Sequence, residues 1–292
     1  MKFWRLPTFW TLTVGLCVCA LPGTSVLAGE EKPAKAEGTA KPKVPEELLG
    51  DEHVKEEFGV NEFTTPSIRK IFDQLDALGT LPYETLKRPL PDKAPPDRVL
   101  LSLALGELIA DGFLVVQCEK VEAMESVGRG LLRYAKALGA GTRLSRHSQS
   151  LLENSVKGDW KKLREELSST QHDVEAEMVQ LRDSEVAHLI SLGGWLRAFE
   201  ISTQAVADHY TPERSRYLSR ADIVEYYIAN LETLHPTVQK LPYMQDLREG
   251  LEAMRPILDV PEGKAFTQAE VNDLRDKARL LSLIVQERMA GK

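Results

Sequence analysis

Glycine and proline divide the chain from residue 65 onward into helix-length segments, and this punctuation limits the possible folds most strongly. The breaks fall at residues 79, 139–141, 158, 211–212, 235–236, 256 and 261–263. Between the breaks, apolar residues recur every three or four positions, and no segment shows the alternation of a half-buried strand. In the last segment, Thr267 and Glu270 form a capping box ahead of apolar residues at helical spacing. The sequence therefore predicts an all-α fold.

We expect a single domain over residues 62–292, built as an irregular bundle of about nine helices. The first helix begins after Thr65 and stops at Gly79. The others are expected at 97–125, 126–138, 143–156, 158–182, 184–208, 212–234, 237–255 and 267–290. Whether segment 158–208 is one continuous helix stays open, because Asp183 followed by Ser184 is also a helix-start signal. Five prolines within residues 80–97 predict an extended crossover.

Residues 99–116 are apolar enough to resemble a membrane span, but Glu107 and Asp111 interrupt them. We therefore expect a buried core helix. Small residues recur along it at every fourth position, namely Ser102, Gly106 and Ala110. Since residues four apart lie on one helix face, another helix is expected to approach closely there.

Residues 1–28 have the pattern of a cleavable secretory signal. Two basic residues precede a short apolar run at 11–20, and Val26 and Ala28 supply the small residues of a cleavage site. The apolar run is too short for a comfortable membrane span. We expect an exported chain, periplasmic or extracellular after cleavage near Ala28, with no transmembrane segment in its mature form.

Residues 29–61 are expected to form a disordered linker, because Lys, Glu, Ala, Pro and Gly dominate them and large apolar residues are scarce. After cleavage of the signal, Cys118 is the remaining cysteine, so the domain is expected to contain no internal disulfide. The net charge of the full chain is −7. An acidic chain argues against a nucleic-acid partner, because contacts with phosphate groups require positive surface.

Glu185 and His188 are the candidate metal ligands. Three residues apart on a helix, they share one face, as carboxylate–histidine ligands do in helical bundles with two metal ions. Such sites use two Glu-x-x-His motifs, and the sequence contains one. The alternatives are a buried hydrogen-bonded pair and a solvated first turn of a helix. We accordingly predict no metal site, and keep this pair as the alternative.

A basic segment provides the candidate anion-binding residues. Between residues 126 and 152 the chain carries five basic residues and no acidic one: Arg129, Arg133, Lys136, Arg143 and Arg146. The first three share a helix face, which could bind an anionic surface. The alternative is pairing with the acidic residues just upstream, at Glu119, Glu122 and Glu125.

Glu107 and Asp111 are also paired carboxylates, four residues apart. Such a pair could bind a cation or carry out acid–base chemistry. Because Cys118 and Glu122 continue the same strip, we instead expect the wet edge of an amphipathic helix.

Common catalytic motifs are missing from the sequence: it has no Gly-x-Ser-x-Gly, His-Glu-x-x-His or Cys-x-x-Cys-His segment. The sequence therefore favours a non-enzymatic exported helical binding or scaffold protein without a cofactor. Its expected partner is a protein or an anionic surface. The alternative function is a metal-binding helical bundle with its site at Glu185 and His188.

Overall fold

The computed structural model describes residues 44–90, 92–139, 150–151, 153–261 and 263–289. Every regular element within these ranges is a helix, which confirms the all-α fold class for the described part of the chain. The expected signal peptide (1–28) and the linker up to residue 43 lie outside the described residues.

The helices are, in chain order, η1 (Glu46–Leu48, a 3-10 helix), α1 (Glu52–Glu57), α2 (Ile68–Ala77), α3 (Tyr83–Leu86), α4 (Arg98–Gln117), α5 (Val121–Leu138), α7 (Trp160–Leu181), α8 (Ser184–Asp208), α9 (Pro212–Ser215), η2 (Arg216–Leu218, a 3-10 helix), α10 (Ala221–Thr233), α11 (Pro236–Gln239), α12 (Pro242–Leu258) and α13 (Gln268–Met289). Residues 150, 151 and 153–156 are also helical. They belong to the expected helix 143–156, whose other residues lie outside the described ranges.

Side-chain caps explain where several helices begin. Asp97 accepts a hydrogen bond from the Leu100 N–H at 2.7 Å and starts α4. The expected capping box at the start of α13 is confirmed. The Thr267 N–H donates to Glu270 Oε2 at 2.6 Å, and the Glu270 N–H donates to Thr267 Oγ1 at 3.3 Å.

Two residues other than glycine have a left-handed backbone conformation and lie where one helix ends and the next begins. Glu119 has φ = 54° and separates α4 from α5, so the boundary expected near residue 125 is too late. Arg182, with φ = 46°, separates α7 from α8, and Asp183 caps α8 by accepting from the Val186 N–H at 3.3 Å. The segment 158–208 is therefore two helices. This conformation costs residues other than glycine roughly 1–2 kcal/mol, so it is rare for them. The residue types at positions 119 and 182 therefore do not predict it.

Short helices account for the remaining differences from the expected bundle. The segment expected as one helix at 212–234 contains α9, η2 and α10, and the segment expected at 237–255 is divided into α11 and α12. The proline-rich crossover at 80–97 contains the single turn α3. Proline at the first turn starts α9, α11 and α12, because its fixed φ suits that position and its missing N–H is not needed there.

Residues 44–65 form a folded segment that we call the N-terminal arm. The sequence predicted a disordered linker up to residue 61, whereas the structure places η1 and α1 within it. Val44, Leu49 and Val60 of the arm are buried against α7 and α8. These apolar residues are too sparse to show helical periodicity, and they become buried only through contacts with distant parts of the chain.

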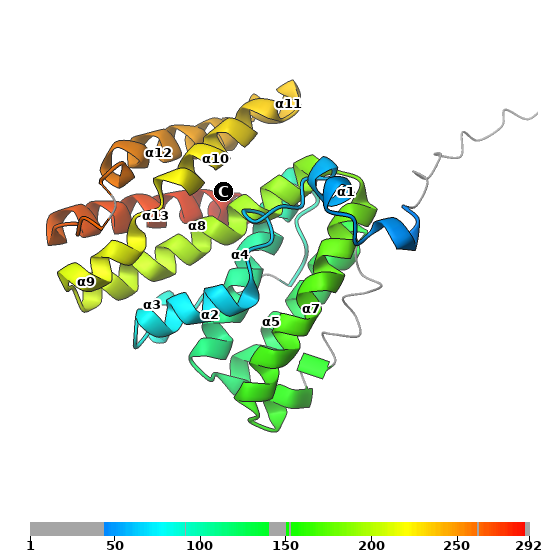
Figure 1. The fold of residues 1–292 in the computed structure, drawn as a ribbon, viewed down its shortest axis with the longest axis horizontal. Helices are drawn as coiled ribbons and strands as arrows, with labels where there is room; N and C mark the ends of the chain where they lie inside the picture. Colours follow the sequence, from blue (N-terminus) through cyan, green and yellow to red (C-terminus); the bar gives the residue numbers. More distant parts are fainter. Residues whose placement is uncertain (1–43, 91, 140–149, 152, 262, 290–292) are drawn as a thin grey trace, which may run out of the picture. The chain divides into compact units, whose positions relative to one another are not determined.

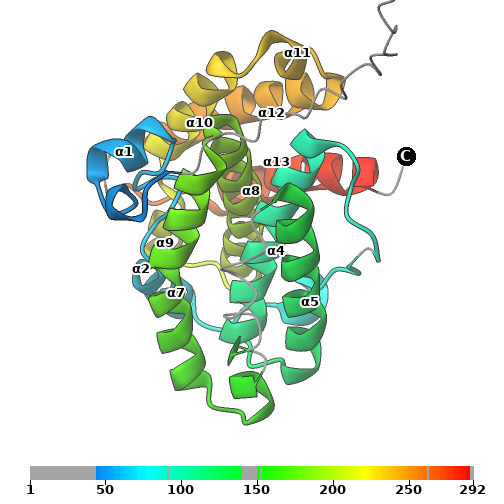
Figure 2. The same cartoon turned by 90° about the vertical axis from the view of Figure 1, so that its right-hand side faces the viewer.

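The long helices pack in a continuous order, which can be followed in two perpendicular views (Figures 1 and 2). Helix α8 packs on both α4 and α13, and α4 packs on α5. On the other side, α13 packs on α12, and α12 packs on α10. The order α5–α4–α8–α13–α12–α10 places α8 and α13 in the middle of the series.

The α4–α8 contact is close enough to exclude side chains. A Cβ atom added to Gly106 would lie 1.9 Å from the Ile190 carbonyl oxygen, and one added to Gly193 would lie 2.0 Å from the Leu103 carbonyl oxygen. The close approach expected from small residues on α4 is therefore confirmed, and α8 contributes matching glycines.

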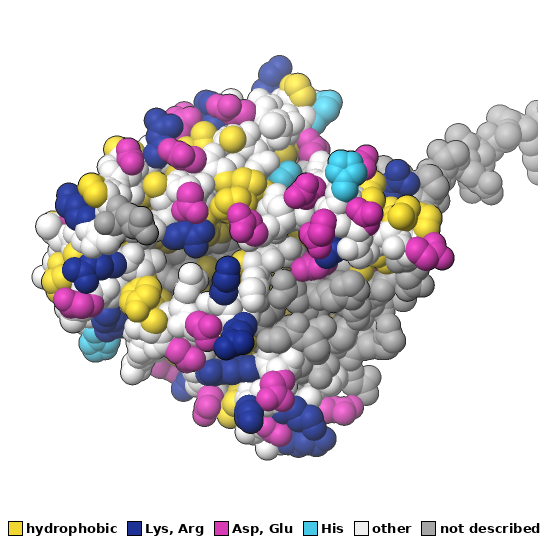
Figure 3. All heavy atoms as spheres, viewed as in Figure 1, with side chains coloured by type: hydrophobic (Ala, Val, Ile, Leu, Met, Phe, Trp, Pro, Cys, Tyr) yellow, Lys and Arg dark blue, Asp and Glu magenta, His cyan; other side chains and the backbone are white. Residues whose placement is uncertain are grey.

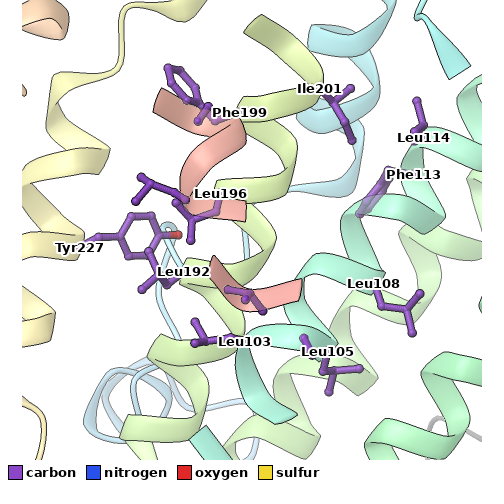
Figure 4. Packing of buried hydrophobic residues seen from close by; sticks show 14 of the residues in the cluster. Leu103, Leu105, Leu108, Phe113, Leu114, Leu192, Leu196, Phe199, Ile201 and Tyr227 are labelled. Carbon is purple, nitrogen blue, oxygen red and sulfur yellow. The ribbon is translucent and has the colours of Figure 1, made fainter. Parts of the chain in front are cut away.

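Helix α4 is long and apolar enough to cross a membrane, but 78% of that window is buried inside the protein. Its expected role as a core helix is confirmed. Figure 4 shows part of the core that it forms with α8, and Leu192 and Leu196 of α8 lie beside Tyr227 of α10.

An apolar stripe runs along α7 and α8, and its side chains are buried to different degrees. Leu163 and Phe199 are fully or nearly fully buried. Trp160 and Trp195 are partly buried and pack against the core, and the Trp195 ring stacks on Phe199 with centroids 5.0 Å apart. The stripe therefore lies on the core side, with its two tryptophans at the edge.

Candidate functional site

Five charged side chains form a buried group that we call the charge cluster: Arg88, Glu107, Asp111, Arg197 and Glu200. Arg88 lies in the proline-rich crossover, the next two residues lie on α4, and the last two lie on α8. The side chain of Arg197 is fully buried, and Glu107 and Glu200 are nearly so. Buried charges are costly unless they are paired, so their partners decide what the cluster can do.

Arg197 bonds through all three guanidinium nitrogens. Nε donates to Asp111 Oδ1 at 2.7 Å, Nη1 donates to Glu200 Oε2 at 2.9 Å, and Nη2 donates to the Leu86 carbonyl oxygen. Burial disfavours its charge, but Asp111 and Glu200 outweigh burial and raise the pKa of Arg197. One side chain of α8 thereby joins α4 to the crossover.

Arg88 joins the crossover to three helices. Its Nη1 donates to Glu107 Oε2 at 3.1 Å on α4, and its Nη2 donates to Glu200 on α8. On α13 the Gln286 amide lies against the same guanidinium, and with its oxygen turned inward it accepts from Nη1 at 2.7 Å. Burial lowers the pKa of Arg88, and the neighbouring carboxylates oppose that effect.

Glu107 is the most perturbed acid of the cluster. Burial raises its pKa to about 8, an effect that the nearby Arg88 reduces but does not cancel. The Ser282 hydroxyl of α13 lies 3.2 Å from its Oε1. Two guanidinium groups face three carboxyl groups here, so one proton on Glu107 makes the cluster neutral. This charge balance supports the direction of the pKa change.

The cluster corrects the interpretation of Glu107 and Asp111 as the wet edge of α4. Both carboxyls point into the cluster, where guanidinium groups hold them. Arg88, Arg197 and Glu200 were not among the candidate residues predicted from the sequence. Arg197 and Glu200 lie three residues apart in an apolar helix, beside a glycine pair, and this spacing could have indicated a buried ion pair. No comparable pattern in the sequence singles out Arg88.

Glu185 and His188 are not brought together as ligands. Glu185 accepts a hydrogen bond from the backbone N–H of His235, ahead of α11. His188 Nδ1 lies 3.1 Å from the Tyr226 hydroxyl on α10, and burial lowers the pKa of its imidazole. No group of three potential ligands that could hold a metal occurs among the described residues. Glu185 lies in the first turn of α8 and is partly buried.

The basic segment is described in part. The Arg129 guanidinium pairs with Glu125 at 2.6 Å, and both side chains are exposed. The Arg133 guanidinium lies over the Tyr134 ring, and Lys136 is exposed. Arg143 and Arg146 lie outside the described residues. On the face shown in Figure 3, basic and acidic side chains are interspersed rather than gathered by sign.

An open groove of about 750 Å³ runs beside α3, between the end of α2 and the residues that follow α4. Its lining includes Leu81, Pro82, Tyr83, Cys118 and Lys120. The Lys120 ammonium lies over the Tyr83 ring, 5.2 Å from the centroid. Burial raises the pKa of the half-buried Cys118 thiol, and Lys120 partly opposes this. The groove offers an aromatic ring, aliphatic surface and charges of both signs.

Comparison with known proteins gives no guide to function. No protein-family model matches the chain, and no curated protein or solved structure is similar to it.

Proposed function

We propose that this chain is an exported, non-enzymatic helical binding or scaffold protein, and that the groove beside α3 receives a segment of a partner protein. The proposed location is the periplasm or the extracellular space, reached through cleavage near Ala28. The export part rests on the signal pattern of residues 1–28 alone.

The observation that carries the non-enzymatic part is the internal pairing of the charge cluster. Arg197 and Arg88 hold the carboxyls of Glu107, Asp111 and Glu200, and they also fasten the crossover to α4 and α8. A carboxylate acting on a substrate needs access to it, whereas these groups are bonded to each other. The cluster is therefore assigned to holding the fold.

The groove supports the binding part because its chemistry suits a peptide. Its open shape and mixed lining resemble the combination of aromatic anchor and polar rim found at protein interfaces. Tyr83 is the natural anchor, since it is aromatic, partly exposed and part of the groove lining. An anionic surface is less favoured as a partner, because Arg129 is already paired with Glu125.

Cys118 offers a direct test, because it is the one cysteine beyond the expected signal peptide and it lines the groove. The mature protein would be labelled there with a photoactivatable thiol reagent, added to the exported fraction and cross-linked. The matched control is Cys118→Ser combined with Lys240→Cys, which places the label at an exposed position outside the groove lining.

We expect the label at Cys118 to cross-link to a protein that the label at position 240 does not capture. The captured protein should bind the purified chain, and Tyr83→Ala should weaken that binding at least about tenfold, roughly 1.4 kcal/mol. Equal capture from both positions, or unchanged affinity of the Tyr83→Ala variant, contradicts it. N-terminal sequencing of the exported protein checks export separately and should read from Gly29.

A further inference from the structure

Much of the lining of the groove beside α3 belongs to one short segment. Residues 80–90 of the crossover, which we call the strap, contain α3, and residues 80–85 all line the groove. The rest of the lining includes Gln117 and Cys118 at the end of α4, followed by Lys120. The groove therefore keeps its shape only while the strap stays against the helices.

The hydrogen bonds that hold the strap on the bundle come from the charge cluster. Between described residues, the backbone–backbone hydrogen bonds of the strap all lie within residues 81–87. The Arg88 guanidinium donates to two carboxylates of the cluster, and the Leu86 carbonyl oxygen accepts from Arg197. The polar attachment of the strap thus depends on the state of the cluster.

A few apolar side chains set the position of the strap. Leu81 and Leu86 are buried in the main core, and Leu90 packs partly against it. Gly130 of α5 leaves space for Leu90, because a side chain at that glycine would meet the leucine. These contacts define where the strap lies, and the charge cluster adds the bonds that keep it there.

The charge cluster contains one carboxyl group more than it has guanidinium groups. The other polar groups near it are uncharged and lie on α13 and α5, namely Ser282, Gln286 and Tyr134. One proton on Glu107 therefore makes the cluster neutral, and burial raises the pKa of this carboxyl to about 8. Loss of that proton leaves a buried negative charge that no neighbouring group balances.

Movement of the strap is the most direct way to relieve that charge. Burial disfavours the charged forms of both Glu107 and Arg88, so both groups gain when water reaches them. In a detached state, the pKa of Glu107 returns toward its ordinary value of 4.5. By proton linkage, the ratio of detached to attached strap rises up to about tenfold for each pH unit, until it levels off above about pH 8.

We propose that the charge cluster is a proton-controlled latch for the groove beside α3. While Glu107 holds its proton, the strap is attached and the groove is complete. When the proton is lost, the strap detaches and residues 80–85 leave the groove. This inference rests on the proposed function of the groove, and it adds that the partner segment is bound in acidic and neutral solution and released in alkaline solution.

Reaction of a buried thiol measures detachment of the strap in the full mature chain. Leu86→Cys, combined with Cys118→Ser, places a single thiol on the buried side of the strap. An aromatic disulfide reagent reaches this thiol when the strap detaches, and dividing by the rate for the same chain in urea removes the thiol's own ionisation. Leu247→Cys with Cys118→Ser is the matched control, because Leu247 is fully buried in α12, outside the strap.

The corrected rate at position 86 should rise at least about tenfold between about pH 6 and about pH 8. At about pH 8 it should also exceed the rate at position 247 at least about tenfold. Adding Glu107→Gln should remove the rise, whereas Glu249→Gln, which changes an exposed acid of α12, should retain it. A rate that is independent of pH, equals the rate at position 247, or rises equally in the Glu107→Gln variant overturns the inference.

A fluorescent label on Cys118 tests whether detachment reaches the groove, and it leaves the strap unchanged. The label is joined through sulfur, so this side chain no longer titrates, and burial keeps the pKa of the Tyr83 phenol above its ordinary value of 10. Emission from the environment-sensitive label should change at least about twofold between about pH 6 and about pH 9, while helical circular dichroism stays constant. In the Glu107→Gln variant, emission should not change.

Constant emission from the labelled, otherwise unmodified chain refutes the latch, and so does the same change in the Glu107→Gln variant. Neither experiment uses the partner protein. A chain that fails both can therefore still capture a partner through Cys118, and a chain that captures none can still show the latch, so the two proposals fail separately.

Discussion

Replacing Glu107 with Gln is expected to remove a pH dependence of stability. In the folded protein burial raises the pKa of this carboxyl to about 8, while in the unfolded chain the group titrates near its ordinary value of 4.5. Between these values the folded protein holds a proton that the unfolded chain has lost. The free energy of unfolding therefore falls as pH rises, and the proton's contribution is complete below pH 4.5 and gone above about pH 8.

The size of the effect follows from proton linkage. Each pH unit within this window changes the free energy of unfolding by about 1.4 kcal/mol, which gives an upper limit of about 5 kcal/mol across it. Glutamine imitates the protonated acid, because its amide can donate to the Ser282 hydroxyl while its oxygen accepts from Arg88. Glu107→Gln should match the unmodified protein near pH 5 and exceed it by several kcal/mol near pH 8.5.

Urea unfolding followed by circular dichroism, at a series of pH values from 5 to 9, measures both proteins. The difference between them isolates Glu107, because the lowered pKa of the partly buried His188 affects both proteins alike. The matched control is Glu200→Gln. It removes the carboxylate that pairs with both Arg88 and Arg197 and should destabilise by about 3–5 kcal/mol. Parallel profiles for Glu107→Gln and the unmodified protein would refute the reasoning.

Three further predictions concern helix packing, capping and the basic segment. Gly193→Ala should lower the free energy of unfolding by about 1–3 kcal/mol or more, because the added methyl group meets a carbonyl of α4. An unchanged free energy in urea unfolding would contradict this close contact. Thr267→Ala should cost about 1 kcal/mol through the lost cap, whereas Thr267→Ser should retain most of it. Changing Arg129, Arg133 and Lys136 together to Gln should leave binding to anionic liposomes at the background of the unmodified protein and change stability by about 0–1 kcal/mol, since Arg129 is an exposed paired residue. Salt-sensitive liposome binding that the triple variant loses would instead establish an anion-binding face.

The features that could be predicted are local in the sequence. The capping box of Thr267 and Glu270 spans four residues, and the helix start at Asp183 follows from its neighbours. The small residues around Gly106 lie on one face by helical spacing alone, so the close approach of another helix also followed. These patterns did not identify the helix that approaches α4, which is α8 and contributes glycines of its own.

The features that escaped prediction depend on distant contacts. Arg88 lies 112 residues from Glu200, and no spacing rule links a residue in a proline-rich crossover to a carboxylate on a later helix. The arm likewise becomes folded only against α7, α8 and α10. The break at Glu119 depends on a backbone conformation that no glycine or proline marks.

The two acidic residues of α4 also have a consequence before the chain folds. On the proposed export route, an apolar stretch of this length passes the translocation channel, where such stretches can be released into the bilayer. Glu107 and Asp111 would then lie near the hydrocarbon centre, and an aspartate alone costs about 2.5–3.5 kcal/mol there. The same carboxyls that are later bound by Arg88 and Arg197 therefore favour complete passage of the helix over retention in the membrane.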